Sequence, residues 1–290
     1  WECFTIPGCY ITLGMLMLFF NTALIAQPIG YEHRKLITLN SSQISGSTDH
    51  VNFPVMVKLT EADLKSTSNG GGVVSPSGYD IIFTQSDGIT PLKHDLQNYS
   101  PSTGDLLCWV NLPTLTPTLD STIYLYYGKL GVYTNPSDTL TWNNNYLGVW
   151  HLEDLSDAAG TYTLTDHNTA ANSGGYLGTA RQFDGDGDDL EDLNGATYLN
   201  GLSSFSVSMW VKSDVVGTDK GLFYGEDPDG LDRRFMLRQD AAGEKGGGTD
   251  VYRSALLLGT NSKQNHESSN GSATTSWQYL TLAWTDGAAT

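Results

Sequence analysis

Short runs rich in β-branched and aromatic residues recur along the chain, separated by segments rich in glycine, proline, serine and asparagine. Several of these runs place large apolar residues at every second position, as in Ile123, Leu125 and Tyr127. That period is typical of a strand with one buried face. No apolar pattern of helical period extends over more than two turns. The chain is therefore predicted to be all-β, with its strands stacked in β-sandwiches.

A polar, turn-rich segment divides the strand patterns into two groups. The 290 residues are enough for two ordinary domains. Residues 31–131 and 146–290 are each predicted to form a β-sandwich, and residues 132–145 are predicted to form a linker. The last strong strand pattern ends only a few residues before position 290, so we expect the second sandwich to be incomplete in this chain.

An uncharged, mostly apolar run, ITLGMLMLFFNTALIA, precedes the first strand pattern. Residues 1–26, which contain it, are predicted to be either a signal peptide or a membrane anchor. A membrane span normally needs about 20 apolar residues, and this run is shorter. Either alternative exports the rest of the chain. We therefore expect a secreted or cell-surface protein that meets the membrane only through an N-terminal anchor.

The charge balance limits the partners that the protein can have. The chain contains 32 acidic and 15 basic residues, a formal net charge of −17. This charge repels phosphate backbones, so nucleic acid is excluded as a partner. Cys108 is the only cysteine outside the apolar leader region, which leaves no internal disulfide, and its apolar surroundings predict a buried core residue.

The segment FDGDGDDLED concentrates carboxylates between two predicted strands. Asp184, Asp186 and Asp188 alternate with glycine, and Asp189 follows at once. Side chains at alternate positions of a tight loop can converge on one hard cation, and Ca²⁺ takes about six to eight oxygen ligands. We predict a calcium site formed by these four aspartates with Asp166 from a nearby loop. The alternative is a solvated hairpin turn.

Catalytic patterns are absent or incomplete. The sequence has neither a G-x-S-x-G nucleophile elbow nor a G-K-S/T phosphate loop, and its six histidines are scattered. No catalytic residue is assigned. Tyr224 is the candidate for ligand binding, because an exposed ring beside polar residues can stack on a sugar. Three tryptophans are predicted to fill the core of the second sandwich: Trp210, Trp277 and Trp284.

Four motifs in the first region, YEHRKLITLNSSQISG, NFPVMVKLTEADLKS, GYDIIFTQSDG and TIYLYYG, occur in a fixed order between residues 31 and 131. In this they resemble DUF2341, a bacterial domain of unknown function found in secreted and cell-surface proteins. The resemblance implies a β-sandwich and brings no known chemistry.

The second region contains LGVWHLED, LGTARQFDGDGDDLE, FSVSMWVKSD and WQYLTLAWTDG. It resembles the concanavalin A-like jelly roll of the laminin-G type, in which an opening strand, expected here at residues 146–152, precedes an acidic turn. It departs from that pattern by the insertion of Gly187 into the turn. The resemblance implies a lectin-like or adhesive module, and many such modules bind Ca²⁺. Relatives that hydrolyse glycosides carry an E-x-D-x-x-E pattern, which this chain lacks.

These features together predict a bacterial binding protein, exported to the surface or secreted. Its expected activity is Ca²⁺-assisted recognition of an extracellular glycan or a cell-surface protein, without turnover. Two alternatives remain open: a polysaccharide-active enzyme or its accessory module, and a structural spacer in a longer adhesin or envelope protein.

Overall fold

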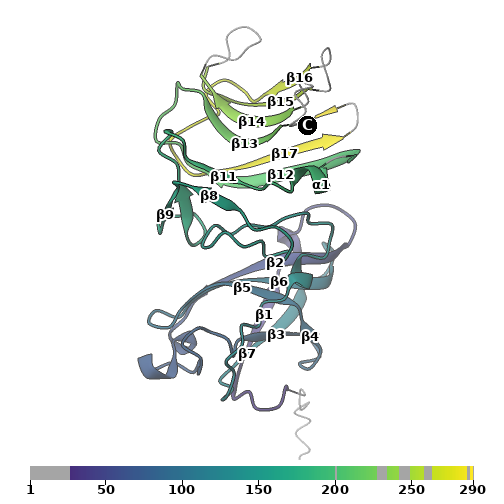
Figure 1. The fold of residues 1–290 in the computed structure, drawn as a ribbon. Helices are drawn as coiled ribbons and strands as arrows, with labels where there is room; N and C mark the ends of the chain where they lie inside the picture. The colour runs from purple at the N-terminus through teal and green to yellow at the C-terminus, as the bar shows by residue number, and fades with distance from the viewer. Residues whose placement is uncertain are drawn as a thin grey trace, which may run out of the picture.

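The computed structural model describes residues 27–199, 201–226, 234–241, 249–257, 263–285 and 288–289. The predicted leader, residues 1–26, lies outside this set. Figure 1 shows two lobes, with β1 to β7 in the first and β8 to β18 in the second. Helix in the described residues is limited to short 3-10 turns and the five-residue α1 (Gly195–Leu199). The prediction of an all-β protein is confirmed.

Two antiparallel sheets form the first lobe. One sheet contains, in spatial order, β1 (His33–Leu39), β7 (Ser121–Tyr127), β3 (Ile82–Gln85) and β4 (Pro91–Leu92). The other contains β2 (His50–Thr60), β6 (Asp105–Leu115) and β5 (His94–Ser100). Three 3-10 turns lie in the connections: η1 (Ser41–Gln43), η2 (Ala62–Leu64) and η3 (Thr67–Asn69).

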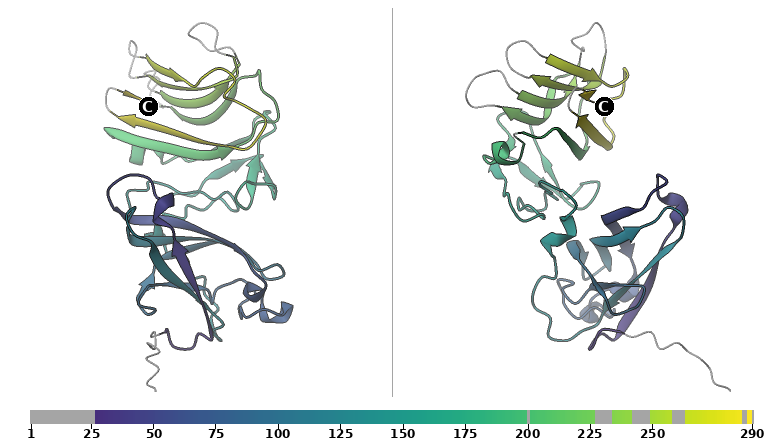
Figure 2. Two further views of the ribbon diagram at one scale, coloured as in Figure 1. Left: turned by 180° about the vertical axis from the view of Figure 1, so that it is seen from behind. Right: turned by 90° about the vertical axis from the view of Figure 1, so that its right-hand side faces the viewer.

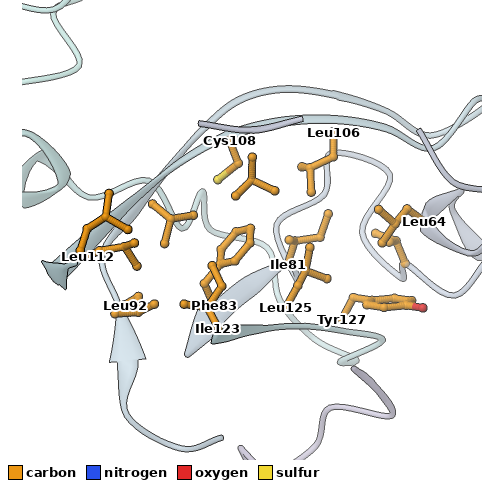
Figure 3. Close-up of a cluster of buried hydrophobic side chains, with 14 residues drawn as sticks. Leu64, Ile81, Phe83, Leu92, Leu106, Cys108, Leu112, Ile123, Leu125 and Tyr127 are labelled. Atoms are coloured by element: carbon orange, nitrogen blue, oxygen red, sulfur yellow. The ribbon is translucent and has the colours of Figure 1, made fainter. Parts of the chain in front are cut away.

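The core of the first lobe lies between these two sheets (Figure 3). Alternation along each strand supplies it: Phe83 and Leu125 come from one sheet, and Leu106 and Cys108 from the other, all almost fully buried. Burial of apolar surface is the main stabilising term for such a layer. The prediction that Cys108 is a core residue is confirmed.

The second lobe contains two larger sheets and two short ribbons. The ribbons pair β8 (Thr165–His167) with β11 (Asp189–Glu191), and β9 (Ala170–Asn172) with β10 (Ala180–Gln182). One larger sheet contains β12 (Ser204–Val211), β17 (Gln278–Thr285) and β18 (Ala288–Ala289). The other contains β13 (Lys220–Glu226), β14 (Arg234–Asp240), β15 (Val251–Leu257) and β16 (Lys263–Glu267).

The two larger sheets of the second lobe face each other through aromatic side chains. Phe205 of β12 meets Phe235 of β14 edge to face at 5.1 Å between ring centroids, and Trp284 of β17 lies 5.6 Å from Phe205. Trp284 is buried, as predicted. Residues 146–152, the expected opening strand of this lobe, contain no strand, so that expectation is wrong.

The segment between β7 and β8 runs from the first lobe into the second (Figure 2). Part of it, the 3-10 turn η4 (Thr139–Trp142), packs on the outer face of the sheet β2-β6-β5. Trp142 is 5% exposed, and Asn111 of β6 donates a hydrogen bond to the carbonyl of Thr141 at 2.9 Å. The residues predicted to form a linker therefore cover the first lobe. No helix among the described residues is long and apolar enough to cross a membrane.

Candidate functional site

The acidic turn lies between β10 and β11, so its predicted place between two strands is confirmed. Its carboxylates close the turn on itself. The Asp186 N–H donates to Asp184 Oδ1 at 2.8 Å, and the Asp184 N–H donates to Asp188 Oδ2 at 2.6 Å. The inserted Gly187 has φ of 80°, a left-handed conformation that glycine adopts without strain. The insertion therefore serves the backbone path of the turn.

Asp166 lies on β8, beside the turn but paired elsewhere. Its Oδ2 accepts from Arg181 Nη1 at 3.1 Å, and its Oδ1 accepts from the N–H and hydroxyl of Thr169. The Thr169 hydrogen bonds and the Arg181 charge lower the pKa of the Asp166 carboxyl. Asp189, on β11, lies opposite His167 of β8.

A positively charged side chain, Lys220, lies at the acidic turn. A Cβ built on Gly185 would lie 2.9 Å from Lys220 Nζ, so this ammonium group lies against the turn and offsets part of its charge. Among the residues that the structure describes, no three His, Cys, Asp or Glu side chains lie where they could hold a metal ion. The calcium site stays a prediction.

Tyr224 lies on β13 and is half exposed. It lines a groove of about 230 Å³ together with Asp219, Lys220, Met236 and Arg238. Lys220 thus connects this groove to the acidic turn, so the structure brings the two predicted sites next to each other. Tyr224 is predicted to bind a ligand because an exposed ring beside polar groups can stack on a sugar, and the groove has this arrangement.

A larger group of aromatic rings, two of them exposed, lies on the outer face of β12 and β17. The ring of Tyr176 stacks on Trp210 with centroids 3.6 Å apart and an interplanar angle of 19°, and Trp210 lies 5.2 Å from its cross-strand partner Tyr279. Tyr176 is 49% exposed and Tyr279 is 55% exposed. We refer to Tyr176, Trp210 and Tyr279 as the aromatic surface.

The aromatic surface corrects the prediction that Trp210 fills the core. Inward-facing residues of β12 and β17 include Phe205 and Trp284, which pair with each other. Trp210 and Tyr279 have the opposite parity along their strands, so they face outward. The same outward row continues with small hydroxyl residues: Ser206, Ser208 and Thr281. The outward row of this strand pair is therefore aromatic at one end, hydroxylated along its length and uncharged.

A polar cluster lies where the segment between β7 and β8 covers the first lobe. Asp95 of β5 is 7% exposed, and its Oδ2 accepts from Trp142 Nε1 at 3.1 Å and contacts His151 Nε2 at 2.8 Å. Trp109 of β6 stacks on His151 with centroids 6.3 Å apart. Burial alone would raise the pKa of Asp95, but the hydrogen bond and charge of His151 and the Trp142 indole outweigh it and lower the pKa.

Glu153 and Gln97 connect this cluster to the second lobe. Gln97 accepts from Trp109 Nε1 at 2.8 Å and donates to Glu153 Oε1 at 3.2 Å. A Cβ built on Gly178 would lie 2.1 Å from Glu153 Oε1, so the turn that follows Tyr176 packs directly on this carboxyl. Burial raises the pKa of Glu153, and the Gln97 hydrogen bond only partly opposes the rise. We refer to Asp95, Gln97, Trp142, His151 and Glu153 as the junction cluster.

The junction cluster borders a pocket of about 250 Å³ that also includes Ser137 and Asp157. Asp157 is buried and accepts from four backbone N–H groups between residues 149 and 162, which holds this strand-free segment in place. Sequence reasoning missed this cluster, because its members are far apart in the chain and carry no motif.

Comparison with protein families identifies one region of the chain. Residues 77–166 match the family described as Domain of unknown function (DUF2341). This confirms the resemblance to DUF2341, although the matched range begins and ends later than 31–131. All members of the junction cluster lie inside it. The comparison with curated proteins found no match, and the comparison with solved structures found none either.

Proposed function

We propose that the protein is an exported bacterial binding protein that recognises a neutral extracellular polysaccharide, without turnover, through the aromatic surface of its second lobe. One observation carries the proposal: Tyr176 and Tyr279 each expose about half of their surface beside Trp210, on the face of the sheet that points away from the core. Exposed aromatic groups of this kind mark interaction sites. The apolar faces of pyranose rings stack on such side chains.

The charge of the molecule and of this face favours a neutral ligand. The net charge of −17 disfavours acidic polysaccharides through long-range repulsion. The serine and threonine hydroxyls along β12 and β17 offer donors and acceptors to sugar hydroxyls without adding charge. The facing sheets and the acidic turn between β10 and β11 also support a laminin-G type jelly roll, which we include in the proposal.

The apolar run before residue 27 supports export, either as a signal peptide or as an anchor. Tyr224 offers a second, smaller contact for the same kind of ligand. Its groove contains charged side chains, Lys220 and Arg238, and it therefore suits a polar substituent better than a bare sugar face. In this proposal calcium would stiffen the acidic turn, and the aromatic surface would bind without it.

Affinity electrophoresis of the purified protein in gels containing soluble glucan, mannan, galactan or xylan tests the proposal. We expect retardation in at least one neutral gel and none in polygalacturonate. Tyr279→Ala and Tyr176→Ala should weaken binding by about tenfold, because stacking of one ring contributes about 1.4 kcal/mol. Tyr133→Ala is the matched control, since this exposed tyrosine lies in the segment between β7 and β8 and is not part of the aromatic surface.

Two outcomes would overturn the proposal. The first is unretarded migration in every neutral gel. The second is retardation of Tyr279→Ala equal to that of the unchanged protein. Release of reducing ends from any of the polysaccharides would contradict binding without turnover and favour the enzyme alternative.

A further inference from the structure

We propose that Gln97 and Glu153 are positioning residues for Tyr176, and that through it they set the affinity of the aromatic surface for its polysaccharide. Both residues lie in the region that matches DUF2341, whereas Tyr176 lies outside it. This inference rests on the proposed function. It gives the matched region a role in binding, although neither residue belongs to the aromatic surface.

Tyr176 belongs to a part of the second lobe that has little buried surface of its own. It lies in the turn between β9 and β10, which pair as a ribbon of two three-residue strands. All three residues of β9 are exposed. A two-stranded ribbon of this size is at best marginally stable by itself. The position of Tyr176 therefore depends on contacts from outside the ribbon.

Two tryptophans orient the ring of Tyr176. The ring stacks on Trp210 with centroids 3.6 Å apart, and it lies 6.5 Å from Trp277, the residue before β17, at an interplanar angle of 58°. These contacts fix the ring against the strands that form the aromatic surface. The backbone of the same turn is contacted separately, by Gln97 and Glu153.

A β-bulge in the first lobe aims Gln97 at this turn. The register of β5 against β6 shifts at Gln97, and bulges of this kind redirect a side chain. Gln97 Oε1 accepts from Trp109 Nε1 at 2.8 Å. Because an indole N–H can only donate, this bond identifies the amide oxygen and leaves Nε2 to act as the donor. Nε2 donates to Glu153 Oε1 at 3.2 Å and to the carbonyl of Leu177 at 3.5 Å.

Glu153 completes the support, from the segment between β7 and β8. Its Oε1 would lie 2.1 Å from a Cβ built on Gly178, and Gln97 Nε2 would lie 3.4 Å from the same Cβ. The two side chains thus meet the backbone at Gly178, where the missing side chain leaves room for them. Together they form a seat for the turn, two residues after Tyr176.

A seated turn should raise affinity because it holds Tyr176 in place before the ligand arrives. Ordering one such side chain on binding costs free energy equivalent to about twofold to tenfold in affinity. Release of the turn can at most remove the contribution of Tyr176 itself, which is about tenfold. Loss of the seat should therefore weaken binding by about threefold to tenfold.

Affinity electrophoresis of the intact chain, in whichever soluble glucan, mannan, galactan or xylan gel retards the unchanged protein, tests this inference. Glu153→Ala should weaken binding by about threefold to tenfold. Glu153→Gln should retain binding, because its amide keeps an oxygen that accepts from Gln97 and fills the same space against Gly178. Tyr133→Ala is the exposed control.

Double variants show whether the effect passes through Tyr176. In a Tyr176→Ala background, Glu153→Ala should weaken binding no further, because the ring that it positions is already absent. In a Tyr279→Ala background, Glu153→Ala should keep its full effect. A general loss of stability would weaken binding equally in both backgrounds.

Hydrogen exchange of the unliganded protein, followed by mass spectrometry, tests the seat without a ligand. The peptide that covers residues 170–182 should exchange faster in Glu153→Ala and at an unchanged rate in Glu153→Gln. The peptide that covers β6, residues 105–115, should exchange at the same rate in both variants and in the unchanged protein.

The outcomes separate this inference from the proposed function. Binding of Glu153→Ala equal to that of the unchanged protein would overturn the inference and leave glycan binding in place. An undiminished effect of Glu153→Ala in the Tyr176→Ala background, an unchanged exchange rate in residues 170–182, or faster exchange in both peptides would overturn it as well. Unretarded migration in every neutral gel would instead overturn the proposed function, and with it the role of the seat in binding.

Discussion

Replacing Asp95 by alanine should destabilise the protein through the junction cluster. The side chain is 7% exposed, and its Oδ2 serves two donors, Trp142 Nε1 at 3.1 Å and His151 Nε2 at 2.8 Å. An alanine leaves both donors without this acceptor, and each buried unsatisfied group costs about 1–3 kcal/mol. The adjoining pocket would admit water to satisfy part of the loss, so we expect a decrease of about 3 kcal/mol in the free energy of unfolding.

Urea denaturation followed by tryptophan fluorescence measures this loss, because Trp109 and Trp142 lie in or beside the cluster. The transition midpoint should fall at an unchanged slope. Asp95→Asn keeps one acceptor oxygen and should lose about half as much. Asp49→Ala, at an exposed position, should stay within about 0.5 kcal/mol of the unchanged protein. An Asp95→Ala variant as stable as Asp49→Ala would refute the assignment of a stabilising role to this contact.

The contribution of Asp95 also has a defined pH dependence. The folded-state pKa of this carboxyl lies below its unfolded value of about 3.9. Its charge therefore stabilises the fold above the unfolded pKa, and this stabilisation is lost as the pH falls through the folded pKa. The difference in urea midpoint between the unchanged protein and Asp95→Asn should shrink as the pH falls through the folded pKa of Asp95.

Three further changes test other parts of the structure. Gly104→Ala should lower the free energy of unfolding in urea by well over 1 kcal/mol, because φ is 77° and the new Cβ would lie 2.0 Å from a backbone carbonyl oxygen. Gly131→Ala is its control, because φ is 76° there and the new Cβ would meet no atom within 4 Å. This control measures the cost of the left-handed backbone conformation alone, which should be about 1 kcal/mol. Burial raises the folded-state pKa of Glu153, so the unchanged protein loses stability as the pH rises from the unfolded to the folded pKa of this carboxyl. Glu153→Gln has no such loss, so its melting temperature should rise relative to that of the unchanged protein over this pH range. The opposite trend would contradict the burial of this carboxyl. Calcium, if bound at the acidic turn, should raise the melting temperature relative to chelator, and Asp184→Asn with Asp186→Asn should abolish the rise; a rise that survives in this variant would place the ion elsewhere.

Strand parity is sufficient to locate the part of the aromatic surface that Trp210 and Tyr279 form. In FSVSMWV, counting from Phe205 assigns Val207 and Met209 to the core and Trp210 to the row of exposed serines. In the partner strand, Tyr279 shares its parity with Thr281. The bulk of Trp210 suggested a core residue, but the pleat decides the face of a strand residue, and large aromatics do occur on outer faces.

Other features could not be read from the chain in this way. The expected strand at residues 146–152 does not form, because this segment is held by hydrogen bonds to Asp157 and by packing around His151. Those contacts join residues from β5, β6 and the segment before β8, which are brought together only in the tertiary structure. Local pattern carries no information about such pairings.

Local patterns in the chain were enough to predict the all-β class, the strands with clear alternation, the buried role of Cys108 and the place of the acidic turn between two strands. These properties depend on periodicity and on turn chemistry, which each segment carries alone. Two contacts depended instead on packing between distant segments: Lys220 lies at the acidic turn, and Asp95 meets His151 across 56 positions of the chain. Such contacts are set by sheet packing and by the path of the segment between the lobes, because both result from the global burial of apolar surface.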